Sequence, residues 1–207
     1  AVVLWVGVGT RNEDLTYNGA AHIVEHMLFK GTPCDTAQDI AEQIENVGGH
    51  MSAYTSREIT SYNVHLLKED VRLGLDILSD MMMNASLPEE EVERERHVIL
   101  QEIGMTYDTP DDYIFDMYQT AAYPGQALGA PILGDAQIIS NMRREALQAY
   151  INAHYHTGNI VVAVAGNIRH RDVQDMAADM LGGLRKGETE KYPRADYKGG
   201  EARQERP

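Results

Sequence analysis

Two histidines four residues apart are the side chains of this sequence best placed to do chemistry. They are His22 and His26, in the run His-Ile-Val-Glu-His. On a helix, side chains at positions i and i+4 lie on the same face, so both imidazoles could bind one metal ion. Glu25 lies three residues after His22 and projects toward the same face. It could therefore contact a water molecule beside the metal without being a ligand itself.

The order H-x-x-E-H is the inverse of the H-E-x-x-H pattern of zinc proteases and is the inverzincin signature. A His-x-x-x-His pair on an amphipathic helix also arises as an ordinary solvated or hydrogen-bonded pair. The five residues alone therefore leave both zinc hydrolysis and a metal-free histidine pair open. A catalytic zinc ion usually has three protein ligands, so a third ligand must lie elsewhere in the chain.

A glutamate-rich segment in the middle of the chain contains the candidates for this third ligand. Ser86 and Glu89 have the spacing of a capping box, and Pro88 suits a first helical turn. We therefore predict a helix that runs from this point to about Tyr107. Pro110 should end it, because the residue before a proline disfavours the helical conformation.

Glu95 and Glu102 share one face of this predicted helix, because they are two helical turns apart. Val92 and Ile99 lie close to that face, so part of it should be buried. A buried carboxylate is costly unless it is paired or bound to a metal. The alternative is that both glutamates are solvated surface charges paired with neighbouring arginines. Periodicity alone leaves both interpretations open.

Taken together, these motifs resemble the pitrilysin-type (M16) zinc metallopeptidases. In this sequence Glu102 follows the second histidine of H-x-x-E-H by 76 residues, with Glu95 one heptad earlier. The similarity extends to four further segments and covers about residues 3–185. The segments are residues 4–13, 48–58, 93–99 and 154–166. The resemblance is greatest to the smaller bacterial processing proteases and to the β-subunit of the mitochondrial processing peptidase.

The resemblance implies a zinc-dependent endopeptidase that cleaves extended peptides or presequence-like segments. It implies one zinc ion per chain, with His22, His26 and Glu102 as its ligands. Glu25 would act first as a general base toward water and then as a general acid toward the leaving amine. Glu95 would not bind the metal itself but would orient one of the ligands or tune the site.

The resemblance also implies where a substrate binds. Ser52, Ala53 and Tyr54 would offer backbone groups to an extended peptide, which would add as a strand. For Tyr54, a half-buried aromatic residue of a strand is an equally good interpretation, because aromatic residues are common in strands.

A second M16 half is the partner implied by the resemblance. It would be joined in cis or supplied as a subunit, a homodimer included, and the two halves would close like a clamshell. In the family that half provides an arginine and a tyrosine for the carbonyl oxygen of the substrate. The alternative function is therefore a catalytically incomplete zinc-binding or interaction half that needs a partner domain or subunit. The presence of Glu25, which metal binding alone does not require, favours the peptidase.

Composition and charge exclude several other kinds of site and partner. The chain has 207 residues, a net charge of −14 and a single cysteine, Cys34. One cysteine excludes a disulfide framework and a zinc ribbon, and the nearby histidines are better explained as metal ligands than as partners of a catalytic thiol. The acidity makes nucleic acid a poor partner. No apolar run reaches about 18 residues, so no membrane span is predicted. We expect a bacterial cytoplasmic protein, with the mitochondrial matrix and the periplasm left open.

The order of predicted elements indicates an α+β fold, an antiparallel or mixed sheet covered by helices. We expect one zinc-binding domain over residues 1–185, lacking its N-terminal start, and a polar linker toward a second half over residues 186–207. The predicted strands are 2–8, 50–56, 60–67 and 160–165. The predicted helices begin near the N-cap residues Asn18, Asp35 or Thr36, and continue with segments at 71–82, 88–107, 111–122, 136–153 and 171–181.

Overall fold

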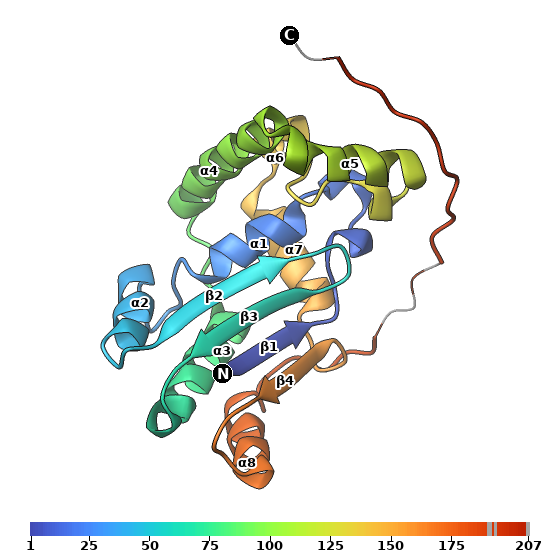
Figure 1. Ribbon diagram of the computed structural model, residues 1–207. Coiled ribbons are helices and arrows are strands. Elements are labelled where there is room, and N and C mark those ends of the chain that lie inside the picture. The colour runs from blue at the N-terminus through green and yellow to red at the C-terminus, as the bar shows by residue number, and fades with distance from the viewer. Residues whose placement is uncertain (190–191, 193, 206–207) are drawn as a thin grey trace.

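A four-stranded antiparallel sheet with the strand order β2-β3-β1-β4 forms the framework of the chain (Figure 1). The computed structural model describes residues 1–189, 192 and 194–205. The strands are β1 (Val2–Val6), β2 (His50–Thr55), β3 (Thr60–His65) and β4 (Ile160–Val164). In the register, Leu4 lies opposite Tyr62 on one side and Val162 on the other. Strand β2 pairs with β3 and stands at the end of the strand order, so within the described residues it is an edge strand. The predicted α+β architecture is confirmed.

The sheet buries one face. Along β1, Val2, Leu4 and Val6 are completely buried, whereas Val3 and Trp5 are partly exposed. Successive side chains of a strand point to opposite faces, so this alternation places one face against the helices. β1 ends two residues before the predicted Val8, because the chain leads into a 3-10 helix at Thr10–Asn12.

Eight α-helices are present in the described residues, and several lie behind the sheet in Figure 1. They are α1 (Ala20–Leu28), α2 (Ala37–Glu45), α3 (Val71–Asn84), α4 (Glu89–Asp108), α5 (Pro110–Ala122), α6 (Ala136–Asn141), α7 (Arg144–His154) and α8 (His170–Met180). The core contains Leu75, Leu78 and Met81 of α3 and Ile99 of α4. The sheet and the helices therefore share one hydrophobic core.

The single helix predicted over 136–153 is two helices. The chain is extended at Met142 and Arg143, between α6 and α7. Met142 is buried at this break, and its carbonyl accepts a hydrogen bond of 2.9 Å from Arg96 Nη2. A contact between distant segments therefore lies at the break between α6 and α7.

Two of the predicted helix caps have different outcomes. Thr36, one of the two predicted N-caps, caps α2, and the carboxylate of Asp39 accepts a hydrogen bond of 2.9 Å from the Thr36 N–H. The capping box predicted for Ser86 and Glu89 is wrong, because α4 begins after Pro88 without a side-chain cap. The Ser86 hydroxyl instead donates to the carbonyl of Gly31 at 2.9 Å.

Residues beyond α8 form neither helix nor strand in the part that the structure describes. Asp196 exchanges two hydrogen bonds of 2.8 Å with the side chain of Gln126. The Lys198 N–H donates to the carbonyl of Ala122, the last residue of α5, at 2.9 Å. This stretch therefore runs beside α5. None of the described helices is both long enough and apolar enough to cross a membrane.

Candidate metal centre

Helix α1 carries both histidines of the H-x-x-E-H motif. Most of its side chains are buried, whereas His22 and His26 remain partly exposed on one side. The helix contacts α4, α7 and strand β2. The contacts of α1 with these three elements therefore fix the position of the helix and the side on which its two imidazoles lie.

The N-terminus of α1 is held by a residue that sequence patterns did not identify. The predicted N-cap, Asn18, is wrong, because Gly19 occupies that position in the left-handed conformation (φ 98°). The carboxylate of Glu13 accepts hydrogen bonds from the N–H groups of Gly19 (2.9 Å) and Ala21 (2.7 Å). Asn18 donates to the same carboxylate at 3.0 Å. Glu13 therefore satisfies helix N–H groups from outside the helix, a role that side chains at the N-cap usually fill.

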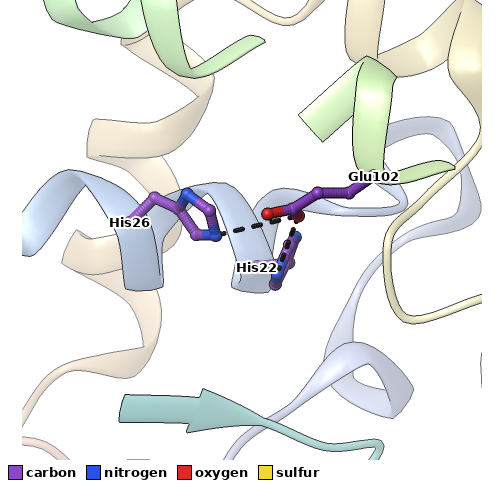
Figure 2. A group of neighbouring side chains, drawn as sticks. All are labelled: His22, His26 and Glu102. Atoms are coloured by element: carbon purple, nitrogen blue, oxygen red, sulfur yellow. Dashed lines mark ion pairs between the residues drawn. The ribbon is translucent and has the colours of Figure 1, made fainter. Parts of the chain in front are cut away.

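Helix α4 brings Glu102 opposite the two histidines. Glu102 Oε2 lies 3.8 Å from His22 Nε2 and 4.0 Å from His26 Nε2. Figure 2 shows the three side chains pointing toward one another, with the carboxylate between the two rings. The ligand atoms that they offer lie within 4.8 Å of one another. These separations are too long for hydrogen bonds and suit three donors arranged around one ion.

The protonation of the histidines is compatible with metal binding. Burial, with a smaller effect from the neighbouring His26, lowers the pKa of His22 to about 4, so this imidazole is neutral near pH 7. His26 Nδ1 lies 2.7 Å from Glu95 Oε2. A carboxylate only accepts, so Nδ1 carries a hydrogen, and in the neutral imidazole this leaves the lone pair on Nε2, which faces Glu102. The residues present therefore fit a zinc ion.

Glu95 and Glu25 lie on either side of this cluster. Glu95 also contacts Lys30, whose Nζ is 2.6 Å from Oε1. Burial opposes ionisation of Glu95, but the hydrogen bonds from Lys30 and His26 outweigh it and lower its pKa. Glu25 is buried and accepts a hydrogen bond of 2.5 Å from the hydroxyl of Thr55. Burial raises the pKa of Glu25, and the bond from Thr55 acts in the opposite direction.

A hollow of about 350 Å³ opens beside the cluster, between α1 and the end of β2. Its lining is His22, Glu25, Ala53, Tyr54, Thr55, Thr106, Asp116, Ile132 and Leu133. Ala53 and Tyr54 thus border the same space as the general-base candidate, while Ser52 is exposed along the strand. The ring of Tyr54 also packs edge-on against Trp5, with centroids 6.1 Å apart. The structure therefore shows Tyr54 packed as an aromatic residue of a strand, and its contact with a substrate stays a prediction.

Comparison with known proteins decides the family. The family model described as Insulinase (Peptidase family M16) matches residues 1–136, and the model described as Peptidase M16 inactive domain matches residues 141–207. The chain is an M16 peptidase family member. A zinc protease of Rickettsia felis is 40% identical over 200 residues, which cover 97% of this chain and 48% of that protein. The probable β-subunit of the mitochondrial-processing peptidase of Arabidopsis thaliana is 39% identical over 180 residues, covering 87% and 34%.

Solved structures of M16 peptidases share this fold. A protease from Helicobacter pylori superimposes with a TM-score of 0.87 at 24% sequence identity, over 95% of this chain and 48% of that chain. Pitrilysin superimposes with a TM-score of 0.83 at 22% identity, over 94% and 21%. This M16 chain spans less than half the length of these relatives.

Three residues of the M16 chain contact the predicted site residues or the helix that carries them, although no sequence pattern pointed to them. Thr55 binds Glu25, Lys30 binds Glu95, and Glu13 binds the start of α1. The contacts of Thr55 and Lys30 join segments far apart in the chain, and the contact of Glu13 starts from a loop before the helix, so helical or strand periodicity carries no signal for them. The predicted site residues His22, Glu25, His26, Glu95 and Glu102 do come together.

Proposed function

We propose that this chain is the zinc-binding half of an M16 endopeptidase that cleaves extended peptides or presequence-like segments. The observation that carries the proposal is the convergence of His22, His26 and Glu102, with Glu25 in the adjacent hollow. We assign the domain to residues 1–185 and a linker to residues 186–207. A bacterial cytoplasmic location belongs to the same proposal.

The metal would be held by three side chains from two helices. His22 and His26 would bind through Nε2 and Glu102 through its carboxylate, with one zinc ion per chain. A bound zinc ion supplies Lewis acidity, which acidifies water and polarises a carbonyl group. His22 contributes as a neutral imidazole, since burial keeps it unprotonated near pH 7.

Glu25 would move the proton. Its carboxylate faces the hollow and would accept a proton from the attacking water, then donate it to the leaving amine. Burial raises its pKa, which makes the carboxylate a better proton acceptor. The bond from Thr55 holds one of its oxygens and so limits the orientations of the group.

The substrate would lie along β2. This strand is at the edge of the sheet, so one row of its backbone N–H and C=O groups faces away from β3. An extended peptide could pair with that row through Ser52, Ala53 and Tyr54. The scissile bond would then pass over the hollow that contains His22 and Glu25.

The experiment that tests this function begins with metal analysis. The wild-type chain should contain one zinc ion, and His22→Ala should lose most of it. His97→Ala is a matched control, because His97 is an exposed histidine of α4. Near-normal zinc in His22→Ala would exclude the metal assignment.

The second measurement separates the base from the ligands. Glu25→Gln should keep the fold and the zinc but lose about two to four decades of peptidase rate when the chain is assayed with a second M16 half. Loss of zinc from Glu25→Gln would mean that Glu25 is a ligand. Full cleavage by the paired Glu25→Gln variant would favour the alternative function, an interaction half whose partner holds the catalytic centre.

A further inference from the structure

Lys30 is a cation that the proposed chemistry does not use. It contacts Glu95, which in turn contacts the predicted metal ligand His26. It follows α1 in a turn, where its N–H donates to the carbonyl of Met27 at 3.1 Å. Its ammonium lies 2.6 Å from Glu95 Oε1, and its side chain is only 27% exposed. A partly buried ion pair of this kind is better fixed than an exposed one, because solvent screens it less.

The carboxylate of Glu95 uses each oxygen for a different partner. Oε1 contacts Lys30 and Oε2 contacts His26 Nδ1 at 2.7 Å. The side chain is 8% exposed, so a partner that is removed is not readily replaced by water. Lys30 and His26 are four residues apart at the end of α1, and Glu95 reaches both from α4. The carboxylate is therefore held from two sides, and its orientation depends on both contacts.

The orientation of Glu95 determines which nitrogen of His26 is available to a metal. In the neutral imidazole, donation from Nδ1 to Glu95 leaves Nε2 without hydrogen, and Nε2 faces Glu102 at 4.0 Å. If Glu95 turned away, His26 could carry its hydrogen on Nε2, and that tautomer offers no lone pair to the cluster. His22 has no such support, because its Nδ1 is buried without a hydrogen-bond partner among the described residues. Of the two histidines, His26 is therefore the one whose ring orientation and tautomer are set by a hydrogen bond before the metal binds.

We propose that Lys30 is a positioning residue, which through Glu95 fixes His26 in the tautomer that leaves Nε2 free for the metal. This inference rests on the proposed zinc site, and it extends the site by one residue. Substitution of a group that supports a metal ligand typically lowers the metal affinity by about 10- to 100-fold. We expect Lys30 to act in that range.

The first test needs no metal. Nitrogen-15 NMR of the metal-free chain reports which nitrogen of His26 carries hydrogen. The wild type should show hydrogen on Nδ1, and Lys30→Met should show a mixture or hydrogen on Nε2. Lys30→Arg should restore the wild-type pattern in part, because it keeps the charge. Lys68→Met is the matched control, since Lys68 is exposed and lies outside the cluster. An unchanged His26 signal in Lys30→Met would overturn the proposal.

The second test uses zinc affinity and a double-mutant cycle. Competition with a chelator should show a loss of about 10- to 100-fold for Lys30→Met and no change for Lys68→Met. In a Glu95→Gln background, Lys30→Met should have little further effect, because its route to His26 is already broken. Additive losses would mean that Lys30 does not act through Glu95 and would overturn the proposal.

Failure of the proposed function gives a different result from failure of this inference. If the wild type bound no zinc, the metal assignment itself would fall, whatever the tautomer. If the wild type bound zinc and Lys30→Met bound it equally well, only the role of Lys30 would fall. Thermal unfolding of each metal-free variant shows whether a lost affinity follows from a lost fold, and Lys30→Arg provides a second variant if Lys30→Met does not fold.

Discussion

The hydroxyl of Thr55 donates a hydrogen bond of 2.5 Å to the carboxylate of Glu25. Thr55 is the last residue of the edge strand β2, and Glu25 lies in the middle of α1. The bond therefore joins the candidate base to the strand on which a substrate would lie.

Thr55→Val keeps the shape of this side chain but removes the donor. Hydrogen bonds to charged groups contribute roughly 1.5–3 kcal/mol, so the loss should lower the peptidase rate of the paired enzyme about tenfold or more. Zinc content should not change, because the hydroxyl of Thr55 bonds to Glu25, which is not assigned as a ligand. Thr120→Val is the control, since the hydroxyl of this α5 residue donates to the carbonyl of Gly129, away from the cluster. A normal rate in Thr55→Val would show that Glu25 is oriented without it.

Glu13 should make the stability of the metal-free fold depend on pH. Burial raises the pKa of Glu13 from 4.5 to about 7, against its hydrogen bonds to Ala21, Gly19 and Asn18. The folded chain then keeps a proton that the unfolded chain has lost, so stability falls as the pH rises across that range. Each pKa unit corresponds to about 1.4 kcal/mol, so the free energy of unfolding should fall by on the order of 3 kcal/mol as the pH rises through this range.

The measurement is urea unfolding of the metal-free wild type and Glu13→Gln at about pH 5 and pH 7.5. The free energy of unfolding of the wild type, relative to the variant, should decrease as the pH rises. Asp14→Asn serves as control, because the exposed Asp14 has a lowered pKa and does not change its charge in this range. A difference that stays constant or grows with pH would contradict the prediction.

Strand addition at β2 predicts a specific sensitivity to the peptide backbone. A peptide methylated on a backbone nitrogen near the cleavage site lacks one N–H donor for the edge of β2. Such a peptide should bind more weakly and be cleaved more slowly than its unmethylated counterpart, while methylation far from the cleavage site should have little effect. Equal cleavage of all these peptides would argue against pairing through Ser52, Ala53 and Tyr54.

The chain assayed alone should be a poor peptidase. Its candidate site contains ligands and a base, and family resemblance assigns the donors for the carbonyl oxygen to a second half. Removal of one such donor typically costs about 10²–10³ in rate, so a second M16 half, fused or added as a subunit, should raise the rate at least about a hundredfold. A fluorogenic peptide assay with and without that half measures the effect. Comparable rates would show that the second half is not needed.

Features that depend on near neighbours in the chain could be predicted from the sequence. His22 and His26 share a helix face because four residues make about one turn, and no distant contact is needed for that. Thr36 caps α2 and Pro110 separates α4 from α5 for equally local reasons. The α+β class followed from the order of such local patterns, and the family resemblance rested on motifs of the same kind.

Only the tertiary structure decided which distant groups support the site. The partners of Glu95 and Glu25, which are Lys30 and Thr55, come from other elements. Such contacts follow from the packing of α1 against α4 and β2, which depends on the whole core. Periodicity along one segment describes which face is apolar, but it contains no information on which polar group from another segment will meet that face.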